Sequence, residues 1–505
     1  MAHFEATLTD VKNERDRLQR LHARMDRDKD FMVLKKYQML DVKNQPVTDV
    51  INVTLNTPAL VAAHVQSALQ SATQQMVVSG EGLGDDVTHP IELMVGAVYK
   101  AADRRLRAKR EPTLRPFITQ QLDMRGRAAT RVTLRMTEAG IFVPDILPID
   151  TRYFYYATDE DGFLWAAYQT LRSLSMIEAT YPDVFSKITH PGNTITHLVV
   201  TDLWDRGTNR IYVGGSETQI GQANSQEVFA QDNIYKNVPF NMQMVELGMM
   251  FKDPDSTEHY GESIYFLARD LFDEDNRQAS INQTLSMKSI KPGEEWVSDQ
   301  GTRATLPKIP PSSIGARTTA DKGGGTQIVP TGDMKDAGKA IGAKIDRSIQ
   351  TGTLSQTDLG NAPVPVSGVA IIQLEEASGE VFLPRLAAKG LLYQDMSEMI
   401  IEQIQNLGVD EIKMGAKGHQ QTYKVSDLEG EYDISYEYIV RTPQTDVARL
   451  SMADIASRWE DDDTIRRDRL KMTDPTDVKE KVAVDRAAVI SEEIDMLRTA
   501  RSLLS

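Results

Sequence analysis

Apolar residues recur with a helical period over the first hundred residues of the chain. From Glu5 to Asp41 the sequence is dense in charge, with apolar residues at three- and four-residue steps, which predicts an amphipathic helix on the surface. A second helix is expected from Pro58 to Met76, and a third opens at His89–Pro90. The apolar residues that define the first and third helices are Val11, Leu18, Leu21 and Met25, and Leu93, Met94, Ala97, Val98 and Ala101.

The period changes to two between residues 131 and 250. Polar and apolar residues alternate in three runs, 131–136, 195–201 and 209–213, bounded by Gly, Asp and Pro, which is typical of β-strands. A helix is expected from Trp165 to Thr180, between the first run and the second. Strands mixed with helices in this order predict an α+β domain.

A long helix is expected from Gly261 to Lys288, and its two halves differ in character. The first half carries an apolar stripe, whereas from Asn276 onward nearly every residue is polar. A helix that is polar on nearly all faces has no core of its own, so it must pack on other helices or stand in water. This half of the helix therefore predicts an oligomeric bundle.

A short module separates this helix from the next. Residues 289–330 are rich in Pro and Gly and contain two short strand-like pieces. From Asp333 to Gln350 the pattern is helical again. Small residues there would let a neighbouring helix approach closely, at a cost in helix propensity of about 1 kcal/mol per glycine. These stem-packing candidates are Ala337, Gly338, Gly342 and Ala343.

Residues 351–366 are expected to form a loop, because two glycines and two prolines prevent regular structure there. The loop contains no Lys or Arg. Helical spacing then continues to Leu407, and Pro384 predicts two helices that meet at a kink. Strand-like segments follow from residues 411 and 432, helices from residue 451, and a terminal helical cap in the tail 474–505.

The composition describes an acidic, folded protein. Its 505 residues favour two to four subdomains. The absence of cysteine excludes disulfides, thiolate nucleophiles and Cys-ligated metals. A net charge of -16 disfavours a general DNA-coating role, but an acidic surface lets a polyanion slide past without sticking. Because no apolar run approaches the roughly 20 residues that span a bilayer, we expect no membrane partner.

One basic cluster interrupts this acidic chain. It could contact phosphate or an acidic neighbouring subunit, or it could be an ordinary charged helix end. Its members are Arg104, Arg105, Arg107, Lys109, Arg110, Arg115, Arg125, Arg127 and Arg131.

Motifs for catalysis are weak throughout. The stretch from Gly332 to Ala340 looks like a phosphate-binding loop, but it is one residue too long and places Ala340 where Ser or Thr should hold magnesium. The eight histidines are scattered without zinc-ligand spacing, and no nucleophile elbow occurs. We therefore expect no enzymatic activity, no cofactor and no metal.

The order of these pieces resembles the portal, or head-to-tail connector, proteins of tailed bacteriophages. The matching stretches, within residues 30–490, are Tyr235–Phe240, Gly261–Ser280, Ser367–Ala370 and Val200–Arg206. The resemblance implies a mixed wing domain, long stem helices, a small clip, a kinked helix and a C-terminal helical crown. The implied divisions are wing 1–250, first stem helix 261–288, clip 289–330, second stem helix 331–351, channel loop 352–366, kinked wing helix 367–407, further wing strands and helices 408–473 and crown 474–505.

By this resemblance the protein would form a dodecameric ring at one capsid vertex of the virion, after assembly in the host cytoplasm. Its partners would be double-stranded DNA passing through the channel, the terminase large subunit, head-tail adaptor proteins, and the major capsid and scaffolding proteins. Residues expected at the DNA channel are Lys344, Arg347, Thr353, Gln356, Asp358 and Asn361. Residues expected to dock partners at the clip are Lys291, Trp296, Arg303, Lys308, Arg317 and Lys322.

Three alternatives stay open from the sequence. Lys344 and Arg347 could instead form a salt bridge between subunits. A capsid or adaptor protein without a channel would have no need of two stem helices around a clip. A nucleotide-dependent DNA enzyme would need an intact phosphate loop, which the chain lacks.

Overall fold

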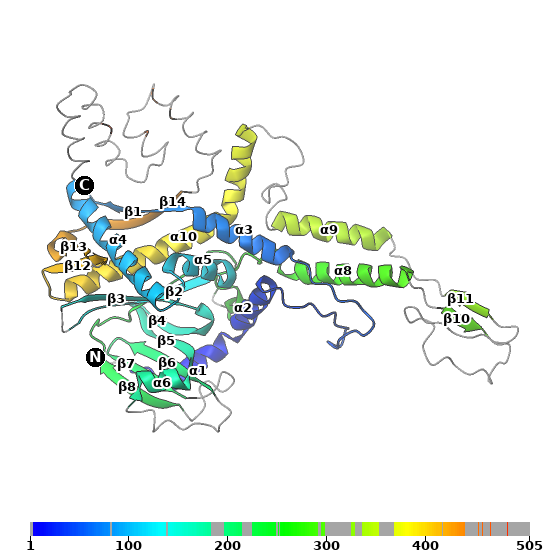
Figure 1. Cartoon of the computed structure of the whole chain (residues 1–505), viewed down its shortest axis with the longest axis horizontal. Coiled ribbons are helices and arrows are strands. Elements are labelled where there is room, and N and C mark those ends of the chain that lie inside the picture. The colour runs from blue at the N-terminus through cyan, green and yellow to red at the C-terminus, as the bar shows by residue number, and fades with distance from the viewer. Residues whose placement is uncertain are drawn as a thin grey trace.

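The protein consists of a broad body of helices and sheets from which a pair of helices projects (Figure 1). The computed structural model describes residues 4–80, 83–137, 140–182, 196–214, 225–248, 251, 253–290, 294–297, 325–328, 336–352, 368–416 and 418–439, and the single residues 453, 457, 465 and 482. Helix and strand are mixed throughout, so the expected α+β class is confirmed. The tail 474–505, where a helical cap is expected, lies outside the described residues apart from residue 482.

The N-terminal segment forms two amphipathic helices rather than one. Helix α1 (Leu8–Arg17) packs on the sheet of the body, and α2 (Gln19–Met32) packs on its helices. The backbone leaves helical geometry at Leu18, which allows the two helices to take different directions. Val11, Leu18, Leu21 and Met25 are at most 2% exposed, while charged residues such as Lys12, Arg17 and Lys29 are exposed, so the predicted amphipathic character is confirmed. Only the expectation of one continuous helix was wrong.

Three helices and one strand follow: α3 (Thr57–Ser71), β1 (Thr73–Ser79), α4 (Asp85–Ala108) and α5 (Leu114–Arg125). The expected second helix ends early, because residues 73–79 pair antiparallel with β14 (Asp433–Ile439). Helix α4 begins before Pro90. The expected residues Met94 and Val98 are buried, but Leu93 lies off the buried face and is half exposed. The buried residues of α4 are Ile91, Met94, Val95, Val98, Ala102 and Leu106.

Two antiparallel sheets form the middle of the body. One has the order β3-β2-β9, from β2 (Arg127–Met136), β3 (Phe142–Ile149) and β9 (Phe240–Met244). The other has the order β4-β5-β6-β7-β8, from β4 (Phe154–Asp159), β5 (Gly162–Ser173), β6 (His197–Asp205), β7 (Thr208–Val213) and β8 (Gln226–Asp232). The short elements η1 (Thr151–Tyr153) and α6 (Leu174–Thr180) flank β5.

The helix expected from Trp165 to Thr180 is mostly strand β5, and only its last seven residues are helical. Both faces of this strand are covered. Trp165 and Ala167 face a cluster with α1, while Ala166 and Tyr168 face a cluster with β2 and β9. A strand buried on both sides reads as a continuous apolar run, which periodicity alone does not distinguish from a helix.

The projecting part contains η2 (Pro254–His259), α8 (Arg269–Ile290), β10 (Glu294–Val297), β11 (Gly325–Ile328) and α9 (Asp336–Gly352). Residues 261–268, expected to be helical, form turns instead. After α9 come α10 (Gly368–Asn406), β12 (Glu411–Ala416), β13 (His419–Lys424), η4 (Val425–Leu428) and β14, so the strands expected from residues 411 and 432 are present.

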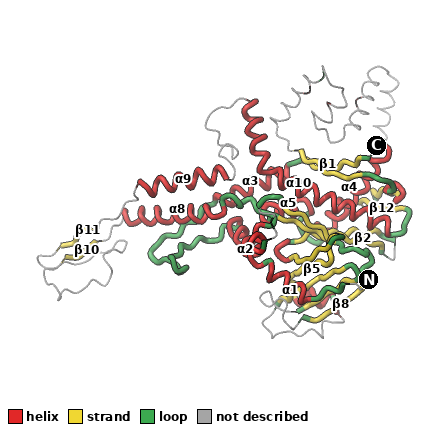
Figure 2. The backbone as a smooth tube through the Cα atoms, turned by 180° about the vertical axis from the view of Figure 1, so that it is seen from behind, coloured by secondary structure: helices red, strands yellow, loops and turns green. Residues whose placement is uncertain are grey.

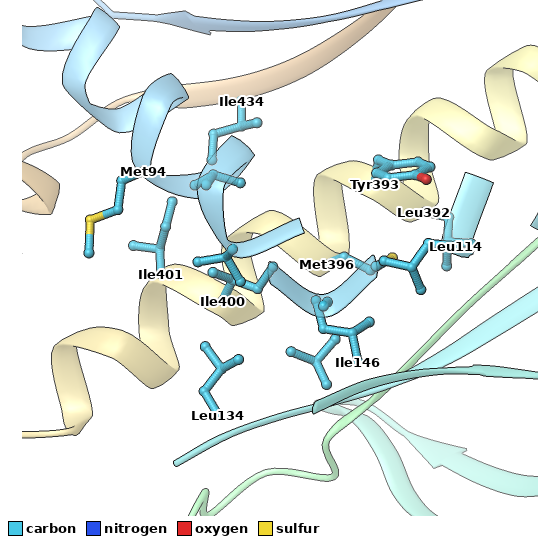
Figure 3. Packing of buried hydrophobic residues seen from close by; sticks show 14 of the residues in the cluster. Met94, Leu114, Leu134, Ile146, Leu392, Tyr393, Met396, Ile400, Ile401 and Ile434 are labelled. Carbon is cyan, nitrogen blue, oxygen red and sulfur yellow. The ribbon is translucent and has the colours of Figure 1, made fainter. Parts of the chain in front are cut away.

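Helix α10 runs for 39 residues and passes through the centre of the body. Figures 1 and 2 show that it changes direction along its length, and Pro384, which lacks an amide hydrogen, lies inside it. Its buried residues Met396, Ile400 and Ile404 pack among α4, α5, β2 and β14 in the largest apolar cluster (Figure 3). The helical spacing expected from the sequence here is confirmed.

Candidate functional site

The candidate functional site is the projecting pair of α8 and α9, together with the segments that hold it. The two helices run side by side away from the body, and the β10–β11 hairpin lies beyond their far end (Figure 2). Among the described side chains of the pair, those that join a buried apolar cluster lie near the body and include Phe272, Ile345 and Ile349. The described part of α9 farther out is largely exposed, including Ile341 at 51%.

Close approach of the two helices within one chain does not depend on Gly342. A Cβ atom at Gly342 would meet nothing within 4 Å, whereas one at Gly352 would lie 3.3 Å from Cβ of Leu267. Gly338 is half-buried and Ala343 is exposed, while the side chain of Ala337 lies outside the described set. Within one chain, tight packing therefore occurs at Gly352, at the base of the pair.

The polar half of α8 is covered by an extended segment of the same chain. We call residues 33–56 the arm, and both views show α8 lying between the arm and α9 (Figures 1 and 2). Asn276 accepts a hydrogen bond from the amide of Leu55, Ser280 from Val53 and Thr284 from Ile51, at 2.8 to 3.0 Å. Residues at four-residue steps on the helix thus match residues at two-residue steps on the arm, since both steps span about 6 Å.

This contact corrects the prediction that the polar half of α8 packs on helices of other subunits. Asn276, Ser280 and Thr284 are 5%, 0% and 8% exposed. The sequence signal that could have found the contact is the Asn-x3-Ser-x3-Thr spacing, a single polar row of short side chains able to accept hydrogen bonds.

The arm is also ordered on its other side. Side-chain oxygens of Asn52 and Thr54 accept the amides of Met39 and Tyr37, at 2.9 and 2.8 Å. At the tip, Oδ1 of Asp41 accepts the amides of two residues that follow it, which fixes a tight turn. Val42, in this turn, is fully exposed.

A buried network of charges fixes the base of α8 to the body. Arg269, at the first residue of α8, donates to Asp28 of α2 at 2.7 Å and to Glu262 at 2.6 Å. Arg24 of α2 lies 3.0 Å from the same Glu262 carboxylate. The side chains of Asp28 and Glu262 are fully buried, so each carboxylate depends on these guanidinium groups.

The backbone segments around this network pack in close contact. Arg24 donates to the carbonyl oxygens of Gly261 and Arg125, at 2.7 and 2.9 Å. Gly126 and Gly261 both have positive φ, and a Cβ atom on either would lie within 2.5 Å of the other's carbonyl oxygen. These two glycines let the end of α5 touch the turn before α8 directly.

Glu262 remains ionised in this setting. Burial raises its pKa, but Arg24, Arg269 and a hydrogen bond with His259 together outweigh burial and hold the pKa of Glu262 below its usual value. His259 Nδ1 lies 2.7 Å from Oε1 of Glu262. The network is therefore assembled at neutral pH.

A second buried cluster lies where α10 bends. Arg385 Nε is 3.7 Å from Asp123 of α5, and Lys389 Nζ lies over the ring of Tyr438, 5.1 Å from its centroid. Burial raises the pKa of Asp123 to about 7, against the two nearby cations. Burial likewise lowers the pKa of Lys389 to about 7. Sequence periodicity missed both buried clusters because it assigns charged residues to the surface.

The basic cluster after α4 is mostly used inside the body. Arg105, Lys109 and Arg131 converge on Asp145, and Arg131 also pairs with Asp202. Arg125 donates to the carbonyl oxygen of Met25. These residues hold helices and strands together rather than forming one open phosphate-binding surface, a role that neither alternative from the sequence predicted.

The expected channel and clip residues are placed only in part. Lys344 and Arg347 are exposed on α9, and Trp296 lies in β10 opposite Thr326. The remaining candidates, namely Thr353, Gln356, Asp358, Asn361, Lys291, Arg303, Lys308, Arg317 and Lys322, lie outside the described residues.

The described part of the chain holds neither a possible metal site nor a membrane-spanning helix. Within it, no three His, Asp or Glu residues gather as a possible metal site. None of its helices is long and apolar enough to cross a membrane.

We expect Glu262→Gln to lower the free energy of unfolding at pH 7 by about 3–5 kcal/mol, because two buried guanidinium groups lose their counter-charge. Because the pKa of Glu262 in the folded protein lies below its ordinary value of 4.5, the ionised carboxylate stabilises the fold at every pH above 4.5. This stabilisation is lost as the pH falls through the pKa of the folded state. Denaturation of both proteins from pH 7 to pH 3 should therefore show a shrinking difference. The exposed Glu246→Gln serves as the control, and a constant difference would contradict the assignment.

Ser280→Ala should leave the part-buried amide of Val53 without its acceptor, at a cost of about 1 kcal/mol. Amide hydrogen exchange should accelerate in residues 51–55, while the interior of α10 stays protected. Gln278→Ala, on another side of α8, is the matched control. Unchanged exchange in the arm would show that the Ser280 contact does not hold it.

Comparisons with solved structures give a likeness in fold. No family model and no curated protein matches the chain. A chain from the neck of an empty gene transfer agent (GTA) particle superposes with a TM-score of 0.40 and 11% sequence identity, over 83% of this chain and 90% of that one.

Proposed function

We propose that this chain is a portal protein whose copies form a ring at one vertex of a phage capsid. The observation that carries the proposal is the projecting α8–α9 pair with a hairpin at its far end. Outside its base the pair shares little apolar core, and Ile341 is half exposed on it. Projecting helices of this kind are stabilised when neighbouring copies pack beside them.

The order of elements supports the same function. A mixed body leads into one projecting helix, a two-stranded tip and a returning helix, and the bent helix α10 follows. This is the order on which the resemblance to portal proteins rests. In this proposal the β10–β11 tip with Trp296 docks the terminase large subunit during packaging and head-tail adaptors afterwards, and the body meets the major capsid and scaffolding proteins.

In this proposal DNA passes through the ring because the acidic protein repels it, and not because a site binds it. The net charge of -16 gives the ring a surface to which a polyanion does not adhere. Exposed Lys344 and Arg347 on α9 supply local positive charge beside the channel loop. The ring acts as a conduit for packaging and ejection, and no catalytic step is assigned to it.

Purified protein should form closed rings with an axial hole wide enough for duplex DNA. Native mass spectrometry gives the subunit number, with twelve expected, and electron microscopy shows the hole. A closed oligomer without a channel would instead support a capsid or adaptor protein of another kind. ATP hydrolysis above background would support an enzyme.

Gly342→Leu separates contacts within a chain from contacts between chains. Because the Cβ position at Gly342 faces open space, leucine should leave the thermal midpoint of the protomer unchanged or raise it slightly through helix propensity. Ring yield, measured by native mass spectrometry, should fall several-fold. Ala340→Leu, on the opposite side of α9, should have no such effect. Equal ring yields for the two variants would place the subunit contact elsewhere.

A further inference from the structure

Two basic residues follow the proline of α10 on one face of the helix. Pro384 lacks an amide hydrogen and crowds the preceding turn, so the helix bends there at little cost. Arg385 and Lys389 are four residues apart, which places them on the same side of α10. They are 2% and 1% exposed, respectively. The bend of α10 (Figure 1) is therefore lined by two buried basic groups.

Several polar groups beside this bend have no hydrogen-bond partner among the described residues. They are both carboxylate oxygens of Asp123, Nζ of Lys389 and the hydroxyl of Tyr438. The carboxylate of Asp123 lies 3.7 Å from Nε of Arg385, which is close enough for an ion pair but too far for a hydrogen bond. Nζ of Lys389 lies 5.1 Å from the ring centroid of Tyr438. A buried polar group without a partner costs free energy, which it regains when water reaches it.

The two sides of this cluster are held differently. A Cβ atom at Gly390 would lie 3.3 Å from the carbonyl oxygen of Tyr436, so α10 lies directly on β14 just after the cluster. Just before Pro384, the side of α10 that carries Leu383 is 60% exposed at that residue. Motion at the bend would therefore turn the part of α10 before Pro384 and leave Gly390 in place.

We propose that the bend of α10 is a hinge that opens to water at the cluster formed by Asp123, Lys389 and Tyr438. Opening lets water hydrogen-bond the three unpartnered groups, and Pro384 lets the preceding part of the helix turn at little cost. The inference goes beyond the proposed ring and does not depend on it, because every group in the cluster belongs to one chain.

The charges around the cluster make the hinge sensitive to pH. Burial raises the pKa of Asp123 to about 7, against the attraction of Arg385 and Lys389. Burial and then the charge of Arg115 lower the pKa of Lys389 to about 7, against the attraction of Asp123. The other titratable groups that face these residues are Tyr393 of α10, Tyr436 and Tyr438 of β14, and Glu262 and Tyr265 of the turn before α8.

Both shifts make the closed cluster least favourable near neutral pH. A carboxyl group with a raised pKa loses stability as the pH rises from its ordinary value to the raised one. A lysine with a lowered pKa loses stability as the pH falls from its ordinary value to the lowered one. Because the two values meet at about 7, the two losses are largest together there, and the hinge opens most readily at that pH.

Amide hydrogen exchange in residues 385–388 measures the opening, because these amides bond to carbonyl groups on the other side of the bend. Lys389→Met keeps an apolar stem and removes the buried amine, so protection should increase about tenfold. Tyr438→Phe removes only the unpartnered hydroxyl and should change protection in the same direction. Ala387→Met is the matched control, because Ala387 is exposed and lies two residues from Lys389 on another side of α10. It should leave protection unchanged.

The pH dependence of the same exchange gives a second measurement. After correction for the intrinsic exchange rate, protection in the natural chain should be lowest at about pH 7 and rise toward about pH 5 and about pH 9. Asp123→Asn should abolish the rise on the acid side, and Lys389→Met should abolish the rise on the alkaline side. Equal protection in Lys389→Met, Tyr438→Phe and the control, or protection that does not vary with pH, would overturn the hinge and leave the proposed portal ring standing.

Discussion

The direction of the projecting helices depends on one buried ionic contact, the pairing of Arg269 with Asp28 and Glu262. Arg269 is the first residue of α8, and both carboxylates are fully buried in the body. Removing charges from water costs several kcal/mol for each ion, so the contact is favourable only in one precise geometry. Arg24 and the paired glycines Gly126 and Gly261 supply that geometry. The ion pairs at its first residue thus fix the direction of α8, while apolar packing stabilises the body.

Sequence periodicity predicted correctly the helices that bury one face and expose the other. The spacing of Met396, Ile400 and Ile404 predicted the buried face of α10, and the bracketing of a short module by two helices predicted the projecting pair. It failed where burial is two-sided or polar. Strand β5 is covered on both faces and was read as a helix, because a continuous apolar run has no period to distinguish the two.

The sequence predicted the helices of the candidate site but not the contacts that they make. The small residues of α9 suggested a close helix contact at Gly342, but within the chain that position faces open space. The polar row on α8 was recognised as unable to form a core, yet its partner was taken to be another subunit. Backbone amides occur at every residue except proline and so give no pattern in the sequence. The side chains of the arm therefore could not show that the amides of Ile51, Val53 and Leu55 bind the polar row of α8.

The same property of the arm has an evolutionary consequence. Its attachment to α8 uses the peptide groups of Ile51, Val53 and Leu55, which every residue except proline provides. Substitutions in this half of the arm can therefore accumulate without detaching it, as long as the three acceptors on the helix persist. The outward side chains can therefore change while the attachment of the arm to α8 stays the same.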